Sequence, residues 1–371
     1  MSPLHAAKRL IVKIGSSLLV DDSTGQVRRG WLETLAADIA ACKARGQEVI
    51  VVSSGAVAVG RRKLGLTPPL KLEEKQAAAA TGQIRLAHAW QDALAHHSIT
   101  VAQVLLTLDD SENRRRYLNA RSTLETLLRL GAVPVINEND TVATAEIRVG
   151  DNDRLAARVA QMVSADALVL FSDIDGLYTA DPRKDAAARF IPEVRELTPE
   201  IEAMAGDPGS AYGSGGMVTK LVAAKICLSA GCRMVITRGE PMHPLKVVEA
   251  GEGRSTWFLP NSEPRTARKQ WIFGSMKPAG TVVLDAGAAR ALAQGRSLLP
   301  AGVTEVEGSF DRGDCVLVKD AGGKVLGRGL VAYSSADARS ILGRKSGDIE
   351  AILGFRGRDE LIHRDDLVME G

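Results

Sequence analysis

The chain has 371 residues, of which 45% are hydrophobic and 25% are charged, and its 47 Lys and Arg residues nearly balance its 45 Asp and Glu residues. This composition is typical of a globular protein with one large domain and one smaller domain. The charge balance argues against a strongly basic, nucleic-acid-binding chain, and no run approaches the roughly 18 apolar residues that a transmembrane helix needs.

The first ten residues, MSPLHAAKRL, lead directly into a strand-like run without the apolar core of a signal peptide. The four cysteines show no CxxC or Cys/His spacing that would indicate a metal site; they are Cys42, Cys227, Cys232 and Cys315. We therefore expect reduced thiols in a cytoplasmic protein without a membrane segment.

From residue 8 to residue 240, short β-rich runs alternate with Ala-rich amphipathic stretches. This rhythm is typical of βαβ units and predicts an α/β fold with an open, mostly parallel sheet sandwiched by helices. The predicted strands are 10–14, 48–52, 101–105, 132–136, 167–171 and 233–236. The predicted helices include 29–45, 73–96 and 120–130, with Gly46 and Gly131 placed to end two of them.

The pattern changes near residue 270. After it, short strands such as 281–284 and 315–319 alternate with glycine turns, for example at 311–314 and 321–323. This predicts a separate, compact, β-rich barrel with one or two helices.

Lys13 lies near the end of the first predicted strand, two residues before Gly15, and a lysine close to a glycine turn outlines a phosphate site. A lysine that simply extends from a strand end into solvent is an equally good interpretation. Ser54 and Gly55 follow the second strand and offer a hydroxyl and backbone donors at the same sheet edge, although a serine there is more often a helix cap.

Two polar clusters, Asn137 to Asp140 and Asp151 to Asp153, contain seven Asn, Asp and Glu residues between them. The first follows a predicted buried strand, and the second precedes the helical run 154–162, where an acidic residue would cap the helix. Both therefore lie at the edge of the sheet where α/β proteins bind ligands. Any one of these residues alone could instead have a purely structural role in a turn or a helix cap, but seven together favour a ligand site.

Two later segments complete the predicted site. The Asp175-Gly176 pair after the strand at 167–171 indicates a hairpin that could flank a nucleotide. The segment 213–220, GSGGMVTK, is a glycine-rich turn that leads into a helix at 218–230 and contains Lys220. This arrangement favours the binding of a polyphosphate group, and a flexible surface loop without a ligand is the alternative. The segment is not a Walker A motif. Two lysines near a carboxylate-rich loop suggest phosphoryl transfer by charge neutralisation and positioning.

Five segments in this order, IVKIGSS, VVSSGAVAVG, VINENDTVATAEIRVGDND, FSDIDGLYTADPR and GSGGMVTK, resemble the glutamate 5-kinases of the amino acid kinase family. LLPAGVTEVEGSFDRGDCV resembles part of a PUA domain. The resemblance implies a kinase domain at 6–265 and a PUA domain at 276–368. Aspartokinases usually carry a KFGGTS-like first segment, and acetylglutamate kinases lack the PUA domain.

The resemblance implies ATP-dependent phosphorylation of the glutamate γ-carboxylate to glutamyl 5-phosphate, the first step of proline synthesis. It also implies magnesium as a cofactor, feedback inhibition by proline, and a homo-oligomer, either a dimer or a tetramer. Handover of the labile product to glutamyl phosphate reductase and RNA binding by the PUA domain are further expectations that it leaves open.

The resemblance also assigns roles to residues. Lys13 and Lys220 would neutralise the transferring phosphoryl group, and Asp153 would orient both lysines. The glutamate site would consist of Ser54, Asn137, Glu138, Asn139, Asp140 and Asn152. ATP would contact Lys13, Gly15, Ser172, Asp173, Ser214, Gly215, Gly216, Met217, Val218, Thr219 and Lys220. Magnesium would bridge the phosphates, with Asp151 as the nearest protein carboxylate.

The chain departs from the family pattern in small ways, with Ser16 and Ser172 where threonine is common and with Ser214 and Val218 in the glycine loop. Two other functions compete with the first. One is an RNA-binding or regulatory protein with an inactive kinase fold. Residues 275–371 carry 13 Lys and Arg and 14 Asp and Glu, and this charge balance argues against strong binding to an RNA backbone. The other is an acetylglutamate or aspartate kinase.

Overall fold

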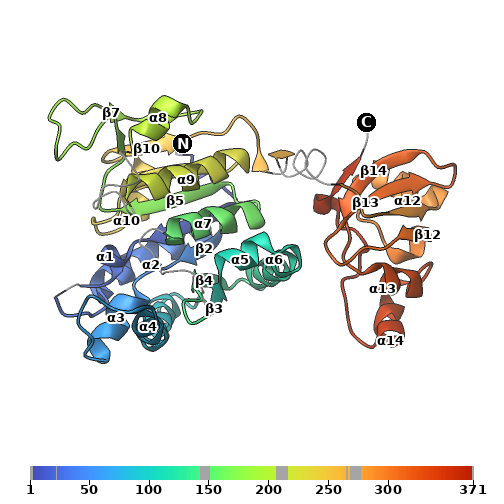
Figure 1. Cartoon of the computed structure of the whole chain (residues 1–371), viewed down its shortest axis with the longest axis horizontal. Helices are drawn as coiled ribbons and strands as arrows, with labels where there is room; N and C mark the ends of the chain where they lie inside the picture. Colours follow the sequence, from blue (N-terminus) through green and yellow to red (C-terminus); the bar gives the residue numbers. More distant parts are fainter. Residues whose placement is uncertain are drawn as a thin grey trace. The chain divides into compact units, whose positions relative to one another are not determined.

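A computed structural model of the chain describes residues 3–21, 23–142, 151–205, 216–264, 266–267 and 277–369. The chain divides into two compact units (Figure 1). The first contains Met1–Asn113 and Asn119–Pro264, and the second contains Arg114–Leu118 and Arg265–Gly371.

The first unit is built on a sheet with the strand order β3-β4-β2-β1-β5-β9-β10-β8. Neighbours from β3 to β9 are parallel, and β10 is antiparallel to β9. The predicted open, mostly parallel sheet is therefore confirmed, and each predicted strand lies within two residues of an observed one. The bounds are β1 Arg9–Ile14, β2 Glu48–Val52, β3 Val101–Leu106, β4 Val133–Glu138, β5 Ala167–Ser172, β8 Glu193–Val194, β9 Arg233–Arg238 and β10 Ser255–Phe258.

Helices cover both faces of this sheet (Figure 1). Helices α2, α3, α4 and α10 share one hydrophobic core with one face of β1, whereas α7 and α9 pack together against the other face. The bounds are α1 Ser16–Leu19, α2 Arg29–Ala44, α3 Ala56–Lys63, α4 Leu72–Ala95, α5 Leu108–Glu112, α6 Arg114–Arg129, α7 Asp151–Met162, α8 Pro199–Ala203, α9 Met217–Ser229 and α10 Pro244–Ala250. Gly46 and Gly131 follow α2 and α6 with positive φ, as predicted.

Three local predictions need correction. Helix α6 begins at Arg114, six residues before the predicted start. Its first turn is a run of charged residues, so the sequence showed no apolar pattern there from which to predict a helix. Helix α7 begins at Asp151, so the second polar cluster forms its first turn and does not precede it.

The prediction of a hairpin at Asp175-Gly176 is wrong. Strand β6 (Leu177–Tyr178) pairs with β7 (Phe190–Ile191), and β5 pairs with β1 and β9. Gly176 is required there for close packing, since a Cβ on it would lie 2.5 Å from the Thr256 hydroxyl oxygen.

Helices α3 and α4 cross at two glycines. A Cβ on Gly60 would lie 1.7 Å from the Ala78 carbonyl oxygen, and one on Gly82 would lie 1.9 Å from the Ala56 carbonyl oxygen. Only glycine allows the two backbones to come this close. The contact fixes α3, which begins directly after Ser54 and Gly55.

The second unit has its own mixed sheet with the order β12-β11-β13-β14-β15, in which only the β11–β13 pair is parallel among the described strands. Its core includes Val282, Val316, Val318 and Ile341. In the described part of this unit, three short α-helices accompany the sheet, where one or two were predicted. The bounds are β11 Gly280–Leu284, β12 Val303–Gly308, β13 Cys315–Asp320, β14 Val325–Leu330, β15 Leu367–Met369, α12 Ala286–Ala293, α13 Ser335–Ser340 and α14 Ile349–Leu353.

The four cysteines are free and buried. In the described part of the chain, no helix is both long enough and apolar enough to cross a membrane.

Candidate active site

Lys13, Asp153 and Lys220 form a buried ion cluster at the carboxyl edge of the parallel sheet. Lys13 Nζ lies 2.5 Å from Asp153 Oδ1, and Lys220 Nζ lies 3.2 Å from Asp153 Oδ2. Asp153 is 0% exposed, and the two lysines are 6% and 7% exposed. Three residues that are far apart in the sequence therefore place two ammonium groups on one carboxylate.

Strand periodicity explains why Lys13 reaches this cluster. Leu10, Val12 and Ile14 belong to the core on the α2 and α4 side of β1. Since side chains alternate along a strand, Lys13 points to the opposite face, where α7 lies. Asp153 is in the first turn of α7, and Lys220 is in the first turn of α9, so both meet Lys13 at the same edge.

The electrostatics of the cluster are set by its burial. Burial lowers the pKa of Lys13 below its ordinary value; the charge of Asp153 opposes this shift and the charge of Lys220 adds to it. Burial alone would raise the pKa of Asp153, but the charges of Lys13 and Lys220 outweigh it and hold that pKa below its ordinary value. Thr219 also donates a hydrogen bond of 3.0 Å to Asp153 Oδ2. The carboxylate is thus kept ionised between two cations.

Asn152 is the centre of a second polar group beside this cluster. Its Nδ2 donates to Ser54 Oγ at 2.8 Å, to Asn137 Oδ1 at 3.1 Å and to the Ser53 carbonyl at 3.2 Å. Asn137 Nδ2 in turn donates to Gln83 Oε1 on α4 at 2.6 Å. The ends of β2 and β4 and the start of α7 are therefore tied together by side-chain amides.

Unlike its Nδ2, the carbonyl oxygen of the Asn152 side chain has no hydrogen-bond partner among the described residues. Oδ1 is buried and accepts no hydrogen bond from the described residues. A buried acceptor without a donor is costly, which makes this oxygen a position where a bound donor would be favourable.

The remaining predicted substrate residues lie at the end of β4. Asp140 is 8% exposed, and Glu138 and Asn139 are half-buried. Asn139 Oδ1 accepts a hydrogen bond of 2.6 Å from the Thr141 hydroxyl, so part of its polar capacity is used within its own turn.

The predicted nucleotide residues come from three segments. Gly15 precedes α1, and Ser172 ends β5, donating a 3.0 Å hydrogen bond to the exposed Asp173. Gly216 is the N-cap of α9, and no side chain among the described residues caps this end, which begins with Met217, Val218 and Thr219. Ser214, Gly215 and the side chain of Asp151 lie outside the described residues.

Gln83, Ser53 and Trp90 are polar partners that the sequence did not indicate. Trp90 Nε1 donates to the buried Ser53 hydroxyl at 3.2 Å, which anchors the loop before Ser54 on α4. Gln83 and Trp90 lie within an Ala-rich helix and belong to no motif, so only the packing of α4 on the sheet reveals their position.

The described residues contain no group of three His, Cys, Asp or Glu side chains that could hold a metal ion.

Comparison with known proteins assigns the family. Residues 8–238 match the profile of the Amino acid kinase family, and residues 280–353 match that of the PUA domain. The chain is 92% identical over 371 residues to a glutamate 5-kinase of Paramagnetospirillum magneticum, covering 100% of both chains. It is 65% identical over 361 residues to a glutamate 5-kinase of Rhodospirillum rubrum, covering 97% of this chain and 96% of the other.

A solved structure supports the same fold. A carbamate kinase from Giardia lamblia aligns with 69% of this chain and 100% of its own, with a TM-score of 0.50 and 16% sequence identity. At that identity the likeness shows the fold alone, whereas the similarity to the two glutamate 5-kinases extends over nearly the whole chain. The chain therefore belongs to the amino acid kinase family and, within it, to the glutamate 5-kinases.

Proposed function

We propose that this protein transfers the γ-phosphoryl group of ATP to the γ-carboxylate of L-glutamate, giving L-glutamyl 5-phosphate and ADP as the first step of proline synthesis. The observation that carries the proposal is the pair of buried ammonium groups on Asp153, next to the amide group around Asn152. In this scheme residues 6–265 form the kinase domain and residues 276–368 form the PUA domain.

Lys13 and Lys220 act on the transferring phosphoryl group. An oxygen of the glutamate γ-carboxylate attacks the γ-phosphorus, the bond to the bridging oxygen breaks, and ADP leaves. Negative charge that spreads over the phosphoryl oxygens is neutralised by the two ammonium groups, which already lie in a low-dielectric site. Asp153 is the positioning residue, because its two oxygens hold the lysines at 2.5 and 3.2 Å.

Glutamate binds beside this cluster. Ser54, Asp140 and Asn152 are its proposed contacts, and the turn from Asn137 to Asn139 shapes the pocket. The buried, unsatisfied Oδ1 of Asn152 supports this assignment, since a substrate ammonium group would supply the donor that it lacks.

ATP binds along the ends of β1, β5 and the start of α9. The first turn of α9, which has no side-chain cap from the described residues, offers backbone N–H groups and a helix dipole to phosphate, and Gly216 has no side chain to hinder close approach. Ser214 and Gly215 are further proposed contacts. Asp151 is the proposed protein carboxylate for magnesium, which would be held mainly by the phosphates and would supply positive charge to neutralise them.

Regulation and assembly extend the proposal. We include inhibition by proline at or overlapping the glutamate site, a homo-oligomeric state, a cytoplasmic location, and transfer of the labile acyl phosphate to glutamyl phosphate reductase. The relationship to glutamate 5-kinases supports each of these.

The test is formation of an acyl phosphate from ATP and glutamate, trapped with hydroxylamine as the hydroxamate. N-acetylglutamate and aspartate are run beside glutamate, and each reaction is repeated with proline. We expect product from glutamate alone, reduced by proline. Absence of hydroxamate from glutamate would overturn the proposed reaction, and product from aspartate or N-acetylglutamate in its place would reassign the substrate.

A further inference from the structure

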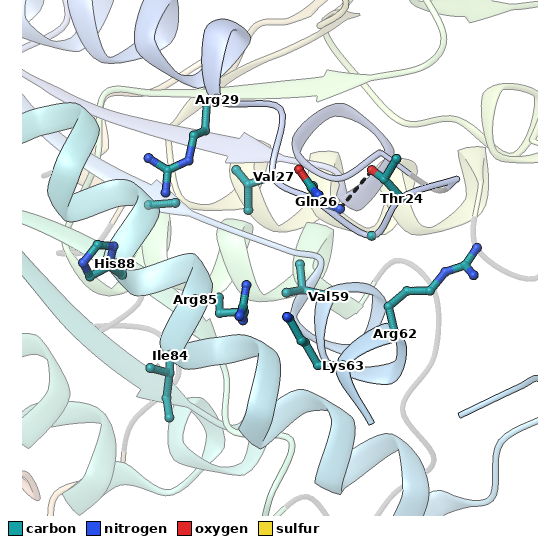
Figure 2. Close-up of a pocket in the computed structure, with 12 residues that line it drawn as sticks. Thr24, Gln26, Val27, Arg29, Val59, Arg62, Lys63, Ile84, Arg85 and His88 are labelled. Carbon is teal, nitrogen blue, oxygen red and sulfur yellow. Dashed lines mark hydrogen bonds between the residues drawn. The ribbon is translucent and has the colours of Figure 1, made fainter. Parts of the chain in front are cut away.

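A polar hollow lies between helices α3 and α4 and the turn that precedes α2. It has a volume of about 790 Å³ and is lined by basic and aliphatic side chains, shown in Figure 2. The basic lining residues are Arg29, Arg62, Lys63, Arg85 and His88, and the aliphatic ones are Val27, Val59, Ile84 and Ala89. Among the described residues, no carboxylate lines the hollow.

Two cations of this hollow, Lys63 and Arg85, have no counter-charge among the described residues. Asp92, just outside the lining, pairs with Arg29 at 3.5 Å and with His88 at 3.0 Å, and so offsets one cation. Lys63 and Arg85 form no ion pair within the part of the chain that the structure describes, and Figure 2 shows both extending into the hollow. Two neighbouring cations without a counter-charge favour the binding of an anion between them, because each adds to the positive potential at the same place.

The walls of the hollow are fixed in position. Gly60 and Gly82 lock α3 against α4 by backbone contact, which holds Lys63 and Arg85 on opposite walls. The turn on the third side is closed by Asp21, whose Oδ1 accepts backbone hydrogen bonds of 3.0 Å from both Ser23 and Thr24. Because these backbone elements are already in place, a bound ligand would have to order only side chains.

The aliphatic residues narrow the class of ligand. A free phosphate or sulfate would use the cations but not Val27, Val59 and Ile84, of which Ile84 is 74% exposed. A volume of this size is in the range of sites for organic small molecules. The hollow thus combines an apolar patch with a cationic one, as a ligand with an apolar body and several negative charges requires.

We propose that this hollow binds an organic polyanion, an aromatic or apolar body carrying two or more phosphate-like groups, with Lys63 and Arg85 as its principal anion contacts. The site is distinct from the proposed kinase site, because neither residue is among those that bind glutamate or ATP there. The proposal does not depend on the kinase activity.

The experiment measures binding of pyranine, an aromatic trisulfonate, to the full-length protein by fluorescence anisotropy at low salt. We expect saturable binding that inorganic pyrophosphate displaces and that weakens as salt is raised. Lys63→Gln and Arg85→Gln should each weaken binding, and the double variant should lower the affinity by about tenfold or more.

The control is the double variant Arg129→Gln with Lys246→Gln, which removes the same charge from exposed positions on α6 and α10. It should bind pyranine as the unmodified protein does. The proposal is overturned if the unmodified protein does not bind pyranine, if the Lys63 and Arg85 variants bind it unchanged, or if the control loses as much affinity as they do. Thermal unfolding of each variant establishes that the comparison is between folded proteins.

Discussion

Lys13 Nζ lies 2.5 Å from Asp153 Oδ1, although 140 positions of sequence numbering separate the two residues and both are almost fully buried. The pair is possible because β1 places Lys13 on the face of the sheet where α7 begins. Lys220 approaches the other oxygen of the same carboxylate, so Asp153 forms an ion pair with each of the two lysines.

Asp153→Asn is expected to reduce stability and turnover together. The amide leaves two buried cations without an anion, which costs about 3 kcal/mol or more, and both lysines lose the charge that positions them. We expect kcat to fall by about 100-fold while KM for glutamate changes much less. Steady-state kinetics and urea unfolding measure the two effects. A raised KM with unchanged kcat would show that Asp153 belongs to the glutamate pocket.

Lys220→Ala should reduce kcat by about 100-fold or more, since it removes an interaction that strengthens as charge develops on the phosphoryl group. Its effect on glutamate binding should be small. Lys225→Ala is the matched control, because Lys225 lies on the same helix with its ammonium paired to Glu202 at 2.9 Å on the surface. Equal losses in both variants would contradict the assignment of Lys220.

Gln83→Ala should raise KM for glutamate with little change in kcat. Gln83 is a positioning residue, because its Oε1 accepts the 2.6 Å hydrogen bond that orients Asn137. Loss of one such bond costs about 1 kcal/mol, or roughly fivefold in KM. Gln91→Ala, at an exposed position of the same helix, should leave KM unchanged. A fall in kcat alone would place Gln83 with the phosphoryl site.

The sequence predicted the order of the strands along the chain, and it predicted that Lys13, the two polar clusters and Lys220 share one sheet edge. Short β-branched runs and glycine punctuation carry that information locally. Residue spacing alone could not reveal that Asp153 contacts both lysines, because spacing does not give side-chain direction between distant elements. Only the family resemblance implied that contact. The false hairpin at Asp175-Gly176 has a similar origin. A turn dipeptide does not show whether its glycine is needed for a turn or for the contact with Thr256.

The PUA domain offers a test of pH dependence at Tyr333. Burial, with the nearby charge of Asp359 as a second cause, raises the pKa of Tyr333 to about 12, and its hydroxyl donates a hydrogen bond to the Arg358 carbonyl. Because the folded protein holds this proton more tightly than the unfolded chain, the stability that Tyr333 contributes is complete below pH 10 and is lost between pH 10 and about 12.

Tyr333→Phe should therefore be less stable than the unmodified protein at pH 8, by about 1 kcal/mol for the lost hydrogen bond. The difference in unfolding free energy between the two proteins should shrink as the pH rises above 10. Calorimetry of both proteins at several pH values measures it. A difference that is constant across this range, or that widens, would contradict the raised pKa of Tyr333.

Gly60→Ala is expected to disrupt the crossing of α3 and α4, because its Cβ would lie 1.7 Å from the Ala78 carbonyl oxygen and the backbones must separate. Overpacking of this kind costs about 3 kcal/mol. The kinase site should respond as well, since α3 begins directly after Ser54, so KM for glutamate should rise. Gly30→Ala is the control within α2: its Cβ would meet nothing within 4 Å, and alanine favours a helix by up to about 1 kcal/mol. Equal unfolding free energies for the two variants, measured with urea, would show that the helices can separate without cost.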